Sequence, residues 1–162
     1  MSTLEIPNFG RILAEPIRAV PEASRVGFIA RLERAAAGRY REWAAQDATL
    51  REGLLACADR EDEIASRAEK LMPVLPEHEE IARAALDRAR ALYAAAFEGH
   101  GLRDCMILQA HAERQGSLAW HAFAAQAGDE PTKRALRALA AIEIESAEFI
   151  DAALGVRSTD RV

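Results

Sequence analysis

The sequence has few of the residues that build disulfide-rich, sheet-rich or membrane-spanning proteins. Only 2 of its 162 residues are cysteines, too few for a disulfide framework, and they form neither a CxxC pair nor a CxxCH haem site. Aromatic residues make up 6%, with 9 Gly and 6 Pro. No apolar run reaches the roughly 18 to 20 residues that span a bilayer, and residues 1–10 lack the pattern of a signal peptide. We therefore expect a cytoplasmic protein in which Cys57 and Cys105 are buried thiols.

An excess of basic charge is also missing. The chain carries 26 acidic and 21 basic residues, a net charge of -5, so its field repels nucleic acids and anionic membranes. It contains no Gly-rich phosphate loop, no Gly-x-Ser-x-Gly turn, no His-Glu-x-x-His and no zinc-ligand spacing. The sequence thus argues against nucleic-acid or membrane partners and against nucleotide or haem cofactors.

What the sequence does have is alanine, the best helix former, at 36 positions. Apolar and small residues recur at three- and four-residue steps, which predicts an all-α protein. We expect one helix over 22–46, a second that follows a cap at Asp47 and continues to Met72, and three more over 77–98, 102–127 and 132–154. Residues 1–21 are predicted to be an arm that docks through Ile12, Leu13 and Ile17, residues 22–154 a helical bundle, and residues 155–162 a tail.

The bundle contains a weak internal repeat. At an offset of 80 residues, Glu33 aligns with Glu113, Tyr40 with Trp120, and residues 43–46 with 123–126. At an offset of 82 residues, Glu61 aligns with Glu143 and its flanking apolar positions also match. The repeat predicts two helical hairpins of similar plan, joined by the long connection that contains the third helix.

Four of the repeated residues are glutamates on the apolar stripes of their helices: Glu33, Glu61, Glu113 and Glu143. None of them has Lys or Arg three or four residues away, so no ion pair within the helix neutralises it. Ionised carboxylates buried without compensation cost several kcal/mol each, so the pattern predicts protonation, distant arginine partners or a bound cation.

This pattern resembles the ferritin-like superfamily, and within it the rubrerythrin-like di-iron carboxylate proteins. The resemblance covers residues 22–154 and implies a four-helix bundle of two hairpins joined by a long helical crossover. In that family each hairpin supplies one Glu from its first helix and a Glu-x-x-His from its second. By resemblance, Glu33 and Glu113 match the first kind and Glu61 and Glu143 the second.

The chain departs from the family pattern at both expected histidines. The residue three positions after Glu61 is Ile64, and the one after Glu143 is Ser146. Glu63 is an alternative inward residue on the second helix, although Arg60 and Arg67 at helical spacing favour an outward position. Candidate supporting residues around the glutamates are Tyr40, Gln109, Trp120, His121 and Ser146.

The resemblance implies a centre of two iron or manganese ions held by the four glutamates. It also implies a role in iron handling or in peroxide or oxygen reduction, as a peroxidase or oxidase type of di-iron oxidoreductase. Since no rubredoxin-like cysteine module is present, any electron donor would be a separate protein, and a homodimer is expected. The alternative is a metal-free bundle whose carboxylates bond to neighbouring polar groups and which serves as a dimerisation or protein-interaction scaffold.

Overall fold

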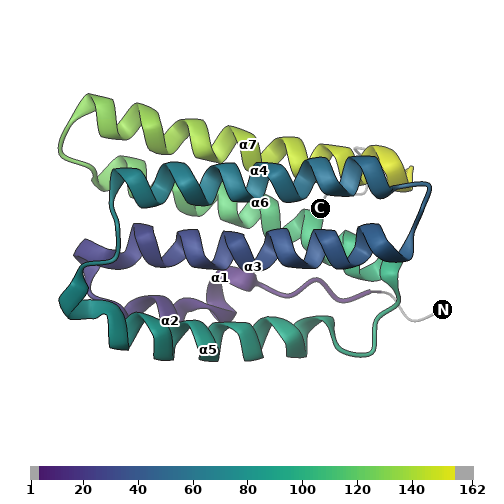
Figure 1. Cartoon of the computed structure of the whole chain (residues 1–162), viewed down its shortest axis with the longest axis horizontal. Helices are drawn as coiled ribbons and strands as arrows, with labels where there is room; N and C mark the ends of the chain where they lie inside the picture. Colours follow the sequence, from purple (N-terminus) through teal and green to yellow (C-terminus); the bar gives the residue numbers. More distant parts are fainter. Residues whose placement is uncertain (1–3, 156–162) are drawn as a thin grey trace.

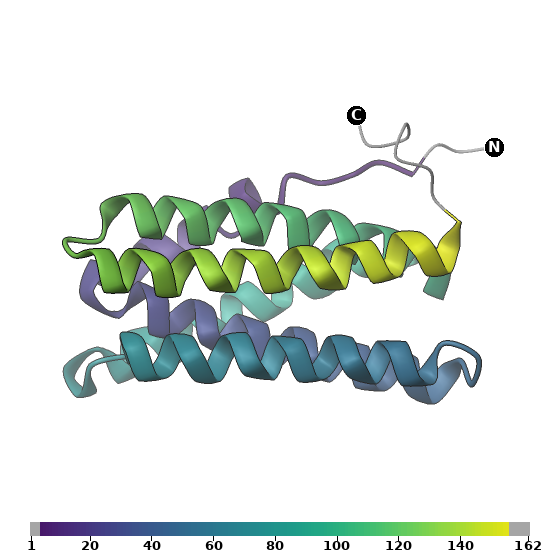
Figure 2. The same cartoon turned by 90° about the horizontal axis from the view of Figure 1, so that it is seen from above.

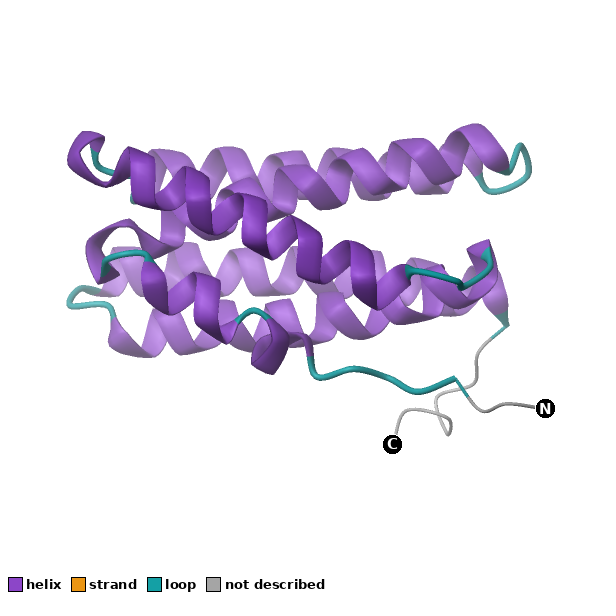
Figure 3. Cartoon of the chain, turned by 90° about the horizontal axis from the view of Figure 1, so that it is seen from below, coloured by secondary structure: helices purple, strands orange, loops and turns teal. Residues whose placement is uncertain are grey.

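The computed structural model describes residues 4–155, and within them it contains helices and no strands (Figure 3). The prediction of an all-helical protein is confirmed. Five helices are long: α3 (Arg25–Gln46), α4 (Arg51–Leu71), α5 (Glu79–Phe97), α6 (Leu102–Gln126) and α7 (Glu130–Leu154). The shorter elements are α1 (Phe9–Ile12), α2 (Ala14–Ala19) and the 3-10 turns η1 (Glu22–Ser24) and η2 (Pro76–His78). None of the described helices has an apolar stretch long enough to cross a membrane.

The helix ends follow from local chemistry. Asp129 caps α7 by accepting a hydrogen bond from the Thr132 amide at 2.9 Å, and Gly155 ends α7 in the left-handed conformation with φ of 65°. Asp47 accepts hydrogen bonds from the amides of Thr49 and Leu50, so it closes the turn before α4. The tail predicted for 155–162 lies, apart from Gly155, outside the described residues.

The long helices form two pairs of consecutive neighbours. Helix α3 packs along α4, and α6 packs along α7 (Figures 1 and 2). The two pairs meet through α4 and α7, while α5 lies against α2 and α3 on the opposite side of the molecule. Buried apolar side chains fill the interior, and both cysteines are buried as expected.

The first 21 residues differ from a simple arm, because they form the short helices α1 and α2. Asn8 starts α1 by accepting a hydrogen bond from the Arg11 amide at 2.8 Å. Phe9 is buried and stacks on Tyr93 of α5, with ring centroids 5.2 Å apart. Leu13 is also buried, so the segment docks on the body as predicted. Such short helices are not stable alone and depend on tertiary contacts. They are also too short to show helical periodicity in the sequence.

Candidate metal centre

The four predicted glutamates come from the two helix pairs, α3 with α4 and α6 with α7. All four point into the interior. Glu33 lies on α3, Glu61 on α4, Glu113 on α6 and Glu143 on α7. Glu61, Glu113 and Glu143 are buried, with 0%, 3% and 1% of their surface exposed, and Glu33 is half-buried. The inward placement read from the apolar stripes is therefore confirmed.

Three of these glutamates have carboxylate oxygens close together, and the fourth does not belong to this group. One carboxylate oxygen from each of Glu33, Glu61 and Glu143 lies within 4.8 Å of the others, and we call these three residues the glutamate triad. Glu113 does not belong to the triad. Its Oε1 accepts hydrogen bonds from the Tyr40 hydroxyl at 2.5 Å and from the Gln109 amide at 2.7 Å.

Two of the three triad residues each accept a hydrogen bond from one neutral donor. The Trp120 indole donates to Oε1 of Glu143 at 2.8 Å, and the Ser146 hydroxyl donates to Oε1 of Glu61 at 3.1 Å. Four of the five candidate supporting residues thus contact a glutamate: Tyr40, Gln109, Trp120 and Ser146. The fifth candidate, His121, is exposed to solvent and does not face the glutamates. It lies about 80° around the helix from Glu113, enough to turn it away from the interior.

Two carboxylate oxygens in the triad receive no hydrogen bond from another described residue, while the Glu143 carboxyl group itself interacts with Glu113. Among the described residues, Oε2 of Glu61 and Oε2 of Glu143 are buried and accept no hydrogen bond. Buried polar atoms of native proteins are nearly always paired, so each unpaired atom requires an explanation such as a bound ion. Both of these atoms belong to residues that face the same third carboxylate, Glu33.

The electrostatics of the cluster favour the neutral form of its carboxyl groups. Burial and the neighbouring Glu113 raise the pKa of Glu33 to about 8, although Arg39 opposes the rise. Burial raises the pKa of Glu61 and of Glu143 well above the usual range, and the adjacent glutamates add to the effect. A cation placed among these groups would reverse that balance, because an opposite charge favours the ionised carboxylate.

The choice between Glu61 and Glu63 is settled by burial. Glu63 is exposed and pairs with Arg67 one turn further along α4. Glu61 is the inward residue of this helix.

No imidazole replaces the two missing histidines. Ile64 is fully buried in an apolar cluster, and Ser146 donates its hydroxyl hydrogen to Glu61. The donor set that remains is composed of carboxylate oxygens, which suit hard cations such as Mn²⁺, Mg²⁺ and Ca²⁺ and are acceptable to Fe²⁺. The residues present fit such an ion and do not fit the histidine-containing set that the family resemblance implies.

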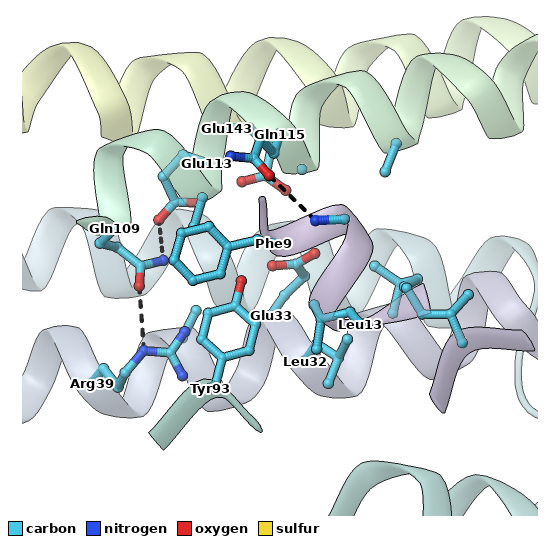
Figure 4. A pocket seen from close by; sticks show the side chains of 17 residues that line it. Phe9, Leu13, Leu32, Glu33, Arg39, Tyr93, Gln109, Glu113, Gln115 and Glu143 are labelled. Atoms are coloured by element: carbon cyan, nitrogen blue, oxygen red, sulfur yellow. Dashed lines mark hydrogen bonds between the residues drawn. The ribbon is translucent and has the colours of Figure 1, made fainter. Parts of the chain in front are cut away.

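A pocket of about 80 Å³ connects this cluster to the gap between α3 and α6 (Figure 4). Glu33, Glu113 and Glu143 line it on the inner side, and Phe9 of α1 and the following Leu13 cover it. Gly116 also lines the pocket, and a Cβ there would lie 3.0 Å from Oε1 of Glu143. A residue without a side chain therefore gives the Glu143 carboxyl group its room.

Sequence reasoning missed Arg39, the cation nearest to the cluster. Its guanidinium lies 4.6 Å from the centroid of the Tyr93 ring, and its Nε donates to Oε1 of Gln109 at 3.3 Å (Figure 4). Arg39 stands six residues after Glu33 on the same helix, a spacing that predicts no intrahelical contact. Only the packing of α5 and α6 against α3 reveals its place.

Comparison of the chain with protein-family models, curated proteins and solved structures finds no significant match. The functional argument therefore rests on the geometry of the site.

Proposed function

We propose that the protein is a ferritin-like metal protein that binds divalent manganese or iron in its glutamate cluster and acts in iron handling or in peroxide or oxygen reduction. The observation that carries the proposal is the pair of buried, unpartnered oxygens, Oε2 of Glu61 and Oε2 of Glu143, beside a third carboxylate. Two such atoms in one cluster match the need of a cation for several oxygen ligands.

The helix arrangement supports the same proposal. Two antiparallel pairs, α3 with α4 and α6 with α7, are connected by a segment that contains α5. This order is what we expect of a ferritin-like four-helix bundle with a helical crossover, and each bundle helix supplies one glutamate to the interior.

The residues of the chain have separable roles in this proposal. Glu33, Glu61 and Glu143 hold the ion, Ser146 and Trp120 orient two of these carboxylates, and Glu113 adds negative charge beside them. A bound manganese or iron ion would supply redox chemistry or Lewis acidity. The aliphatic side chains of Leu13 and Leu32 form part of the wall of the pocket beside the site.

The experiment that tests the proposal is elemental analysis of the full chain, expressed with added iron and manganese. The test variant is Glu61→Gln with Glu143→Gln. The matched control is Glu63→Gln with Glu145→Gln, which changes exposed residues two positions further along the same helices. We expect wild type and control to retain metal and the test variant to lose it.

The opposite result identifies the metal-free scaffold. In that case wild type holds no iron or manganese after purification, and the test variant is more stable than wild type at about pH 8, because two buried acids have been removed. Thermal unfolding followed by circular dichroism measures this difference and also shows that each variant folds.

A further inference from the structure

The four glutamates are not equivalent, because Glu113 lies outside the group whose oxygens converge and one of its two oxygens already accepts two hydrogen bonds. A carboxylate oxygen has two lone-pair sites, and Oε1 of Glu113 accepts both the Tyr40 hydroxyl at 2.5 Å and the Gln109 amide at 2.7 Å. Gln109 is held in turn by Arg39 (Figure 4). This network fixes Glu113 from outside the triad, and the unpartnered oxygens belong to Glu61 and Glu143 instead.

The spacing of the triad matches a single ion. Two ligands of one ion are at most twice the metal–oxygen distance apart, which is about 4.1 Å for Mg²⁺ and about 4.6 to 5.2 Å for Ca²⁺. The three oxygens of the triad lie within 4.8 Å of one another, which is inside the range for Ca²⁺, and a smaller ion requires the carboxylates to move slightly closer together. A pair of ions about 3.5 to 4 Å apart would need further ligands on the second ion. Ile64 and Ser146, which stand at the histidine positions, do not supply them.

The remaining coordination positions have a source in the adjacent pocket. Glu33 and Glu143 belong both to the triad and to the pocket wall. The pocket, with a volume of about 80 Å³, has room for water molecules beside the triad. Three carboxylates with water ligands are a typical environment for a hard divalent cation.

We infer that each chain binds one hard divalent cation, of the Mn²⁺ class, through Glu33, Glu61 and Glu143, and that Glu113 is a positioning residue rather than a ligand. This inference rests on the proposed function and differs from the two-ion centre that the family resemblance implies. Glu113 acts through its neighbours, since its hydrogen bonds tie α3 to α6 on one side of the triad.

The test is manganese stoichiometry with electron paramagnetic resonance. The full chain is stripped with a chelator, loaded with Mn²⁺ and freed of unbound ion, and manganese per chain is measured. We expect one Mn²⁺ per chain, with the hyperfine pattern of an isolated ion. Glu61→Gln and Glu143→Gln should bind Mn²⁺ about tenfold or more weakly, whereas Glu113→Gln should still saturate at one ion with the same spectrum.

Glu63→Gln is the matched control, because Glu63 is an exposed residue on the same helix as Glu61. Two ions per chain with a spin-coupled spectrum would overturn the inference and leave the proposed function intact. A folded Glu113→Gln protein that fails to bind Mn²⁺ would overturn the assignment of Glu113. A wild-type chain that binds neither manganese nor iron would overturn the proposed function itself.

Discussion

Each buried glutamate is held by neutral donors rather than by an arginine. Glu61 receives a hydroxyl hydrogen bond, Glu143 an indole N–H, and Glu113 a phenol and an amide. Neutral donors fix the direction of a carboxylate without removing its charge. The side chains therefore leave carboxyl oxygens that a cation can bind, which an ion pair at each position would have occupied.

Tyr40 offers a direct test of how strongly one such donor holds its glutamate. Tyr40→Phe removes the 2.5 Å hydrogen bond to Glu113 and leaves a buried carboxyl group with one donor fewer. We expect the free energy of unfolding to fall by about 1 to 3 kcal/mol, the usual cost of an unpaired buried polar group. Urea unfolding at fixed pH measures it.

Tyr93→Phe is the control for that measurement. Tyr93 lines the same pocket and stacks on Phe9, but within the described residues its hydroxyl makes no hydrogen bond to another side chain. Its removal should change stability by less than the Tyr40 substitution. Equal losses for the two variants would contradict a specific role for the Tyr40 hydroxyl.

At the scale of helices, the sequence predicts the long elements well and the short ones poorly. Helices α3 to α7 carry two or more turns of apolar stripe and end at Gly, Pro or Asp, so their bounds follow from periodicity and capping. Helices α1 and α2 have four and six residues, too few for a stripe. Their stability comes from packing on α5 and α6, which no local pattern records.

Some features of the site can also be predicted from the sequence, and others cannot. The inward position of all four glutamates follows from the stripe and from the absence of basic residues at helical spacing. The position of Glu113 outside the triad does not follow from the stripe, because its hydrogen-bond partner Tyr40 lies 73 residues away in sequence. Arg39 was missed for the same reason, since Gln109, its hydrogen-bond partner, lies 70 residues away. Contacts between helices depend on rotation and register, which stripes fix only within wide limits.

Helix α1 is the element that covers the pocket, and Gln115 of α6 holds it. The Gln115 amide donates to the Pro7 carbonyl at 3.2 Å, and its oxygen accepts from the Gly10 amide at 3.2 Å. We predict that Gln115→Ala loosens this cover and increases the rate of Mn²⁺ uptake severalfold, while the number of ions bound at saturation is unchanged. Stopped-flow mixing with a manganese indicator measures the rate.

Gln126→Ala is the matched control, because Gln126 is exposed at the end of the same helix. It should leave the uptake rate at the wild-type value. An unchanged rate in Gln115→Ala would show that the ion reaches the triad by another route than the pocket beneath α1.

At the scale of the whole molecule, the basic residues are used at the surface and the interior stays acidic. Arginines pair with acids between helices, as in Arg31 with Glu79 at 2.7 Å and Arg34 with Glu69 at 2.6 Å. Each of these exposed ion pairs contributes little stability, but each one holds an arginine side chain at the surface and away from the core. The net charge of -5 and the buried carboxyl groups both favour the approach of cations over that of anions.

The buried carboxyls predict an unusual pH dependence for the metal-free protein. Because the pKa of Glu33 is raised to about 8, and those of Glu61 and Glu143 are raised well above their usual range, the folded state binds more protons than the unfolded state above about pH 5. Stability is therefore fully present below the unfolded pKa values and is lost as pH rises through the folded ones. Each extra proton contributes a slope of about 1.4 kcal/mol per pH unit.

The clearest range for this measurement is about pH 7 to about pH 8.5. The lowered pKa of His111 has the opposite effect, but only near and below its ordinary pKa of 6.5. We expect the unfolding midpoint of chelator-treated protein to fall across this range. The fall should be smaller in Glu61→Gln with Glu143→Gln, because two of the titrating groups are gone. A midpoint that rises with pH in wild type would contradict the electrostatic description of the cluster.

Saturating Mn²⁺ should reverse this trend, because protons and the cation compete for the same carboxylates. A bound ion at about 100 times its dissociation constant adds about 2.7 kcal/mol to the free energy of unfolding. That gain should be largest at about pH 8.5, where deprotonation costs least, and should shrink toward about pH 6. A manganese-induced shift of the unfolding midpoint that is equal at both pH values would mean that the ion binds outside the glutamate triad.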